Sequence, residues 1–423
     1  MLLSLLEGLV AAGVWAWDAL TGDSSSSTSA PTPQPCPQRP SGATPSRSTS
    51  WKSTHPQTSS RCCAQGPLPP AGGGWLAQCG TGNLPVGGPT TVYDPNGTPL
   101  QLSASDELAS GGEGTVYRCP GHDSFVIKLY KRDIVENPEK QKAVIERLQD
   151  MLSIKALRTN HDIAWPQMPV YDAEKRVVGF VMRAVSGTSV GSLQGAERIR
   201  MLFPGWDRED LALVARDFLD KMQLLANHGV LVNDFNPANF IVGRDHKVRL
   251  IDCDSYQIPS ANGGAPHVAT SYFASHVAPE ILLQPSLLKR PRGPEQARFG
   301  AAIIVFQLLM CGQHPYSHKN GGMPEENLRS GKCPLGIGAG CLIPTGWYNL
   351  LSYLPYTTMD KFIRMFRDGH GNSSVRPTLG ELRKEVEKFL FEMKRDPLRK
   401  DLSPATPKMK SNTAQGPWKK KAA

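Results

Sequence analysis

Regular apolar patterning occupies only part of this 423-residue chain, and this restricts the folds that it can adopt. The patterning begins near Val92 and continues to about Met393, and strand-like runs come mostly before helix-like runs. The strand-like runs are 100–119, 124–130 and 176–185, and the helix-like runs are 137–157, 208–229, 299–312 and 378–393. This order predicts an α+β fold with two segregated lobes.

Two flanking segments have compositions that cannot form a core. Residues 21–95 are rich in Ser, Pro and Gly and predict a disordered linker. Residues 394–423 carry nine Lys or Arg against two Asp, and predict a basic, disordered tail. Contact of this tail with nucleic acid or an anionic membrane is the alternative, but no aromatic residues alternate with the charges as base contacts would require. Nucleic acid is therefore not an expected partner.

Residues 1–20 are mostly apolar and contain no Lys or Arg, which argues against a secretory signal peptide. Glu7 and Asp18 lie eleven positions apart and fall on one helical face. The pattern favours an amphipathic helix that lies on a membrane surface or on a partner protein. A membrane-spanning helix and terminal disorder are the alternatives.

The chain has nine cysteines, an odd number, and no C-x-x-C pair. Cys333 and Cys341 bracket a Gly-rich loop but lack the second pair of ligands that a zinc site needs. This usage predicts a reduced, cytoplasmic protein without a metal site of this kind, associated with membranes only through residues 1–20.

The stretch "GGEG", Gly111 to Gly114, lies between two strand-like runs. Glycines allow backbone amides to approach a phosphate closely, although a simple hairpin turn has the same composition. Lys128 follows in the apolar run "FVIKLY" and is either an edge residue or a ligand for phosphates held under the loop.

The stretch "NDFNPANF", residues 233–240, places an acid, amides and a proline between apolar runs. An acid such as Asp234 can accept a proton from a hydroxyl group. The Asn239 amide and Asp252, in "LIDCDSY", can hold magnesium through oxygen. Ordinary capping of a loop by Asp and Asn is the alternative for each residue alone.

From about residue 103 to 391 the chain resembles a eukaryotic-like protein kinase of the bacterial variety. "ASGGEGTV" is similar to the family's G-x-G-x-x-G-x-V loop, "VIK" to V-A-I-K, "VNDFNPAN" to H-R-D-L-x-x-x-N and "DCD" to D-F-G. The resemblance implies a β-rich N-lobe over 96–186 and a helical C-lobe over 187–393. It implies catalytic roles for Asp234, Lys128 and Asn239, nucleotide contacts at Gly111, Gly112, Gly114, Val116, Lys128 and Glu146, and metal ligands at Asn239, Asp252 and Asp254.

Further motifs extend the resemblance. "APE" at 278–280 is similar to the end of the family's activation segment, and "SVRPTLGELRKEV" is similar to its closing helix, which implies that Arg376 pairs with Glu280. "VATSYF" is similar to V-G-T-P-E-F and implies that Thr270 bonds near the base. "IAWPQM" and "GFVMRAV", with the NDFNxxN and IDCD motifs, are similar to a bacterial subgroup of these kinases.

Several positions depart from the family. Asn233 replaces the arginine that usually binds a phosphorylated activation loop, so activity without a loop phosphate is expected. Ala297 stands near the place of an Asp that normally ties the catalytic loop to a buried helix. Asp254 replaces a glycine and is interpreted as an added metal ligand. The helix glutamate that pairs with Lys128 is interpreted as Glu146, with Glu139 as the rival, and an ordinary exposed helix glutamate is the alternative.

The resemblance therefore implies phosphorylation of Ser or Thr hydroxyls in proteins, with ATP and Mg²⁺ as cofactors. The hydroxyl-rich linker is itself a candidate for autophosphorylation. Two alternatives remain at this point: a small-molecule phosphotransferase with a kinase-like fold, and an ATP-binding pseudokinase. The substrate and the oligomeric state are not predicted.

Overall fold

The computed structural model describes residues 90–268, 271–336, 342–344 and 346–408, all within one compact unit, Pro69–Ala423. The predicted helix over 1–20, most of the predicted linker, Thr270 and residues 409–423 lie outside the described residues. Across the ranges that the structure describes, no helix is both long enough and apolar enough to cross a membrane.

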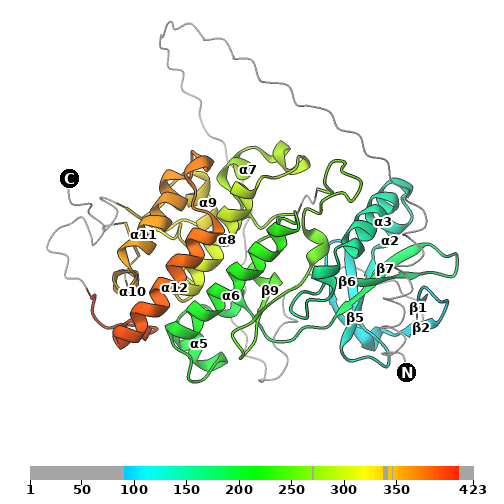
Figure 1. The fold of residues 1–423 in the computed structure, drawn as a ribbon, viewed down its shortest axis with the longest axis horizontal. Helices are drawn as coiled ribbons and strands as arrows, with labels where there is room; N and C mark the ends of the chain where they lie inside the picture. The colour runs from blue at the N-terminus through cyan, green and yellow to red at the C-terminus, as the bar shows by residue number, and fades with distance from the viewer. Residues whose placement is uncertain (1–89, 269–270, 337–341, 345, 409–423) are drawn as a thin grey trace, which may run out of the picture. The chain divides into compact units, whose positions relative to one another are not determined.

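The N-terminal part is an antiparallel sheet of seven strands in the order β2-β1-β6-β7-β5-β4-β3. Its strands are β1 (Thr90–Tyr93), β2 (Pro99–Leu102), β3 (Glu107–Ser110), β4 (Gly114–Arg118), β5 (Phe125–Tyr130), β6 (Pro166–Tyr171) and β7 (Val177–Arg183). One face buries Ile127 and Val181, and the other buries Phe180 against Leu148 of helix α3 (Pro138–Ser153). Figure 1 shows α3 lying against this sheet.

Two glycines let the central strands approach one another closely. A Cβ atom on Gly179 of β7 would lie 2.1 Å from the Lys128 carbonyl oxygen, and one on Gly114 of β4 would lie 2.3 Å from the Leu129 carbonyl oxygen. A larger residue at either position would push the strands apart. Strand β5 is therefore held between β4 and β7, with Lys128 at its centre.

The C-terminal part is mainly helical. After α2 (Arg132–Val135), α3 and α4 (Lys155–Arg158), its helices are α5 (Ala196–Leu202), α6 (Arg208–Asn227), α7 (Pro279–Leu283), α8 (Pro294–Leu309), α9 (Pro324–Arg329), α10 (Trp347–Ser352), α11 (Tyr356–Ile363) and α12 (Leu379–Arg395). Figure 1 shows α6 running beside α12 and α8, and these three helices surround the largest apolar core.

Local signals explain the two central helices. Asp207 caps α6 by accepting from the Glu209 backbone N–H at 2.6 Å, and Gly229 follows its end with φ +71°. Helix α8 contains the run "GAAIIVFQLL", which is buried on all sides, as expected for a helix at the centre of a domain.

A small sheet of three strands, β8 (Thr188–Ser189), β9 (Phe240–Val242) and β10 (Val248–Leu250), lies beside these helices. The Leu250 N–H donates to the Asp162 carbonyl at 2.9 Å, and the Ala164 N–H donates to the Leu250 carbonyl at 2.8 Å. These bonds tie β10 to the segment that contains "IAWPQM". The strand that leads into Asp252 is thereby fixed to the segment that leads into β6.

The sheet begins earlier than the sequence indicated. Strand β1 starts at Thr90, inside the range 21–95 predicted as linker and before the predicted domain start at residue 96. Strand β1 pairs with β2 and β6 and buries Val92 almost completely. Order at this edge depends on strands distant in the chain, which the local composition does not reveal.

The C-terminal end also differs from its prediction. Helix α12 reaches Arg395, and residues 396–408, predicted as disordered tail, lie against the helical part. Leu402 is buried in the core, and Lys400 pairs with Glu209 of α6. The high positive charge of residues 394–423 suggested that their cations are solvated. In the structure, Lys400 has an acidic partner and Leu402 has apolar partners within the fold.

The predicted pair between Arg376 and Glu280 is confirmed. The Arg376 guanidinium donates to both Glu280 carboxylate oxygens at 2.8 and 2.7 Å, and it lies 4.8 Å from the centre of the Phe299 ring. It also donates to the Gly369 carbonyl at 2.8 Å. Because Arg376 is fully buried, this pair joins the start of α7 to the segment before α12.

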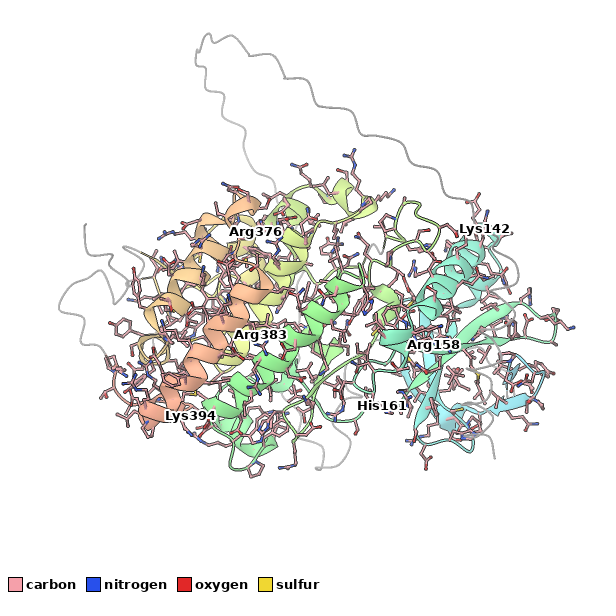
Figure 2. The ribbon with its side chains drawn as sticks, in the orientation of Figure 1. Lys142, Arg158, His161, Arg376, Arg383 and Lys394 are labelled. Carbon is pink, nitrogen blue, oxygen red and sulfur yellow. The ribbon has the colours of Figure 1, made fainter. Side chains whose placement is uncertain are left out.

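Arg376→Met should lower the free energy of unfolding by about 3–5 kcal/mol, because it leaves Glu280 without its cation. Arg383→Met is the control. Arg383 pairs with Asp220 and Glu387 at the surface, where all three side chains are exposed, so its loss should cost less than about 1 kcal/mol. Figure 2 labels both arginines. Urea unfolding followed by circular dichroism measures both, and equal losses would contradict the structural role of Arg376.

Candidate active site

A lysine from β5 and two aspartates from the turn after β10 meet at one point. Lys128 Nζ donates to Asp252 Oδ1 at 2.7 Å and to Asp254 Oδ1 at 2.8 Å. Asp252 follows β10 and has a left-handed backbone, with φ 56° and ψ 40°. A short 3₁₀-helix over Cys253–Ser255 then turns Asp254 towards the same ammonium group. The structure thus brings Lys128 together with two acids that follow it in the chain by 124 and 126 positions.

The two acids differ in exposure. The side chain of Asp252 is 40% exposed, whereas that of Asp254 is 3% exposed. Burial by itself favours the neutral amine of Lys128, but the two carboxylates outweigh it and raise the pKa of Lys128. Asp254 Oδ2 is buried without a hydrogen-bond partner. The exposed acid can reach a bound cation, while the buried acid is committed to the lysine.

The catalytic loop of the sequence analysis is held by its own amides. The Asn236 N–H donates to Asp234 Oδ1 at 3.2 Å, and Asn236 Oδ1 accepts from the Ala238 N–H at 3.0 Å. The latter bond starts the short helix Pro237–Asn239. The Ile251 N–H donates to the Asn239 carbonyl at 3.1 Å and attaches the loop to the strand before Asp252. Loop capping, the alternative interpretation of these residues, is therefore present, and the loop is held next to Asp252.

Asp234 lies in the electrostatic field of the cluster. Burial raises the pKa of Asp234, repulsion from Asp252 raises it further, and the backbone bond from Asn236 and the charge of Arg292 oppose this. A raised pKa makes an aspartate a stronger base, which suits acceptance of a proton from a hydroxyl group.

The Gly-rich loop leaves open backbone next to the lysine strand. Gly111 donates its N–H to the Gly114 carbonyl at 2.8 Å. A Cβ atom on Gly111 would meet only the Gly114 carbonyl oxygen, at 3.8 Å, and one on Gly112 would meet nothing within 4 Å. Neither glycine has a positive φ, so neither packing nor the turn requires them. Open backbone here fits a phosphate group. Val116 pairs in register with Lys128.

Glu113, between Gly112 and Gly114, is a further acid near the cluster that the sequence analysis did not identify. Loss of hydration raises the pKa of Glu113, and repulsion from Asp254 adds to this, while Lys128 and Arg147 oppose it. Its place in "GGEG" was visible in the sequence, but the direction of its side chain was not.

The prediction that Glu146 pairs with Lys128 is wrong for this structure. Glu146 is 52% exposed and lies 3.9 Å from Lys142 on the outer face of α3. The next residue, Arg147, faces the site and donates to the Asp254 carbonyl at 2.7 Å. One residue corresponds to about 100° of helix rotation, which is why the choice failed. The rival, Glu139, is exposed in the first turn of α3.

Arg292 was also missed, and it holds the catalytic loop from behind. Its guanidinium donates to the Asn233 carbonyl at 2.8 Å and to the Ser271 carbonyl at 3.4 Å. Its backbone exchanges two hydrogen bonds with the Gln257 side chain, at 2.7 and 3.1 Å. Burial lowers the pKa of Arg292 to about 10, so the group is still charged near neutral pH. Arg292 thus ties this loop to the residues before α8, near Ala297.

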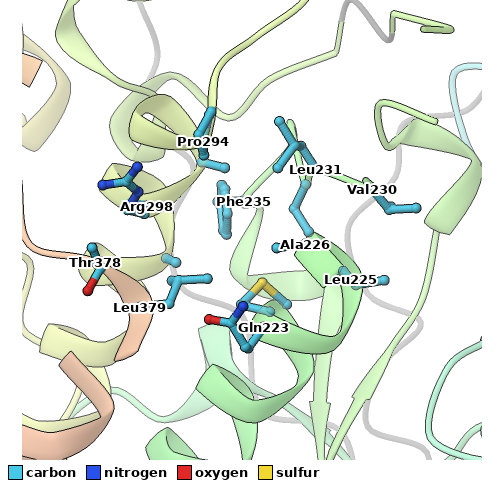
Figure 3. Close-up of a pocket in the computed structure, with 14 residues that line it drawn as sticks. Gln223, Leu225, Ala226, Val230, Leu231, Phe235, Pro294, Arg298, Thr378 and Leu379 are labelled. Carbon is cyan, nitrogen blue, oxygen red and sulfur yellow. The ribbon is translucent and has the colours of Figure 1, made fainter. Parts of the chain in front are cut away.

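A cavity of about 190 Å³ lies on the other side of the same loop. It is apolar and is lined in part by Ala226, Leu231, Phe235, Pro294, Ala297 and Leu379. Figure 3 shows Phe235 between Leu231 and Pro294. The small side chain of Ala297 contributes to this space, which is separate from the charged cluster.

A sheet followed by a helical part, with Lys128 joined to acids at their interface, fits a two-lobed, kinase-like fold. No family model matches the chain. The chain is 33% identical over 229 residues to protein kinase YegI of Escherichia coli O157:H7, covering 54% of this chain and 34% of that protein. It is 33% identical over 213 residues to protein kinase YegI of Escherichia coli strain K12, covering 50% and 32%.

A more distant similarity is to calcium-dependent protein kinase 32 of Arabidopsis thaliana, at 21% identity over 243 residues, covering 56% of this chain and 42% of that protein. The chain spans about a third of the length of the YegI proteins that it matches. Together these similarities support a protein kinase family for the chain.

Arg292→Gln should slow a reaction that uses Asp234 as its base by about 10- to 100-fold, because the loop that carries Asp234 loses its support. The variant also removes a positive charge that lowers the pKa of Asp234. That pKa should rise, so the acid limb of the pH–rate profile should move to higher pH. Arg290→Gln makes the same charge change at an exposed position and is the control. Identical pH profiles for the two variants would exclude this role for Arg292.

Proposed function

We propose that this protein is an ATP-dependent protein kinase that phosphorylates Ser or Thr hydroxyls. The observation that carries the proposal is the 2.7 Å contact between the Lys128 ammonium and the Asp252 carboxylate. Asp234 lies close enough to Asp252 for its pKa to respond to the second charge. The relatives named as protein kinases support the reaction class, and Ser/Thr specificity belongs to the proposal.

ATP and Mg²⁺ would supply the transferable phosphoryl group and a cation that neutralises its developing charge. No side chain blocks the approach of phosphate oxygens to the backbone at Gly111 and Gly112. The Gly111 N–H already donates to the Gly114 carbonyl, so the Gly112 amide and Lys128 would bind the phosphate group. Asp252, being partly exposed, and the Asn239 amide would hold the metal. Asp234 would orient the acceptor hydroxyl and take its proton, helped by a raised pKa.

The activation segment is held in the structure by contacts that need no phosphate. His267 forms a hydrogen bond with Asp150 of α3 at 2.7 Å, and its backbone pairs with Ile258. Gln257 pairs with Leu231 through the backbone and with Arg292 through its side chain. These contacts support activity without a phosphorylated loop, as the replacement by Asn233 led us to expect.

Protein substrates follow from the class, and residues 21–89 offer many hydroxyl groups for autophosphorylation. We also propose a cytoplasmic location. The four cysteines within the described part, Cys119, Cys253, Cys311 and Cys333, are free, which supports a reducing compartment. Membrane association through residues 1–20 stays a prediction.

Asp234→Asn should lower the rate of phosphate incorporation by about 10²–10⁴-fold with ATP binding retained, because the amide cannot accept the hydroxyl proton. Asp252→Ala should abolish incorporation by removing the metal ligand. Asp245→Asn is the matched control, since Asp245 lies on the exposed β9–β10 turn and pairs with Arg249. Mass spectrometry of the full chain after incubation with Mg-ATP, beside an added protein acceptor, measures incorporation.

The outcomes distinguish a protein kinase from a small-molecule phosphotransferase and from a pseudokinase. Phosphoserine or phosphothreonine in the wild type, lost in both active-site variants, supports the proposal. Phosphate found only on an added sugar or antibiotic would indicate a small-molecule phosphotransferase. Saturable ATP binding without incorporation in the wild type would indicate a pseudokinase. Near-normal turnover by Asp234→Asn would reject Asp234 as the base.

A further inference from the structure

The Lys128 ammonium needs a buried anionic partner, and the structure supplies one from an unexpected element. A charge removed from water is costly unless it is paired and hydrogen-bonded. Asp254 is 2% exposed and lies 2.8 Å from Lys128 Nζ, so both members of this pair are buried. Glu146 and Glu139, the acids of α3 considered for this role, are both exposed.

Helix α3 contributes a cation to this site instead of an anion. Arg147 donates to the Asp254 carbonyl at 2.7 Å, and Asp150, almost one turn later, bonds to His267 at 2.7 Å. The helix is therefore fastened to both ends of the segment from 254 to 267. Its contact with Lys128 is indirect and passes through Asp254.

The different exposure of the two aspartates suits them to different roles. Asp252 presents a 40% exposed side chain that a metal can reach. Asp254 has its Oδ1 occupied by Lys128, and the same side chain is almost fully enclosed. This arrangement disagrees with our interpretation of Asp254 as an added metal ligand.

We propose that Asp254 is the positioning residue for Lys128, in place of a glutamate from α3, and that Arg147 holds Asp254 in register. The inference rests on the proposed function, because Lys128 is positioned for a nucleotide phosphate. It specifies the regulation of that site: the lysine is placed by the segment that also carries Asp252. The site therefore assembles without an inward movement of α3.

The test compares how fast Lys128 is labelled at one fixed pH in the wild type and in variants. The probe is an adenosine carrying an aryl sulfonyl fluoride, which reacts only with the neutral amine. The full-length protein is labelled for increasing times, and the modified peptide is quantified by mass spectrometry. Protection by Mg-ATP in the wild type establishes the nucleotide site separately. Absence of protected labelling at Lys128 in the wild type would count against the proposed function itself.

In Asp254→Asn the rate of labelling at fixed pH should rise by about tenfold or more, because loss of one of two adjacent anions increases the fraction of neutral amine. Asp254→Glu keeps the charge and should restore most of the wild-type rate. Glu146→Gln should leave it unchanged. An unchanged labelling rate in Asp254→Asn would overturn the inference. Circular dichroism checks that each variant is folded.

Magnesium dependence separates a positioning residue from a metal ligand. For Asp254→Asn we expect the KM for ATP to rise by about tenfold or more at saturating Mg²⁺, while the Mg²⁺ concentration giving half-maximal rate stays within about twofold. For Asp252→Asn we expect that Mg²⁺ concentration to rise. A similar rise in Asp254→Asn, with normal ATP affinity at saturating Mg²⁺, would identify Asp254 as a metal ligand and refute the proposal.

Discussion

The charge of one buried lysine determines how the parts of the site must lie. Lys128 lies at the centre of β5, between strands held close by glycine, so its ammonium cannot reach bulk water. It must therefore be met by anions from the helical part, and Asp252 and Asp254 provide them. The acids that meet the lysine also lie beside the loop that carries Asp234 and Asn239, and this arrangement supports the proposed kinase site.

The loop that carries Asp234 is supported by hydrogen bonds to backbone carbonyls instead of by charge pairs. Arg292 donates to the Asn233 and Ser271 carbonyls, and so holds the loop that carries Asp234 and the segment before "APE" at once. In the kinases that the chain resembles, an Asp near the position of Ala297 normally performs part of this task. A small residue there leaves the apolar cavity of Figure 3, and the cation five residues earlier takes over the tie to the loop. Equivalent support thus comes from a different residue and a group of opposite charge.

Local signals could be read from the sequence, and long-range ones could not. Helix α6 was predicted well because its cap, its periodicity and its terminal glycine all lie within the helix or next to it. Order at Thr90 and around Leu402 depends on partners far along the chain, so composition misassigned both ends. Lys128 could be predicted from its apolar run and the ordered motifs. The choice of Glu146 was wrong because the next residue of α3, and not Glu146, faces the site. Arg292 binds backbone carbonyls, which any residue type supplies, so no sequence motif indicates its partners.

Lys128 pairs with two carboxylates, and a single carboxylate could not pair with Lys128 and bind a metal cation at the same time. If Asp252 alone paired with Lys128, turning it towards a cation would leave a buried ammonium unpaired, at a cost of several kcal/mol. Asp254 keeps that ammonium paired, so Asp252 is free to exchange one partner for another. Arg147 in turn donates to the carbonyl of Asp254. This bond limits how far the Asp254 carboxylate can shift when Asp252 turns towards a cation. We therefore infer that the second aspartate replaces a glutamate of α3 in keeping Lys128 paired.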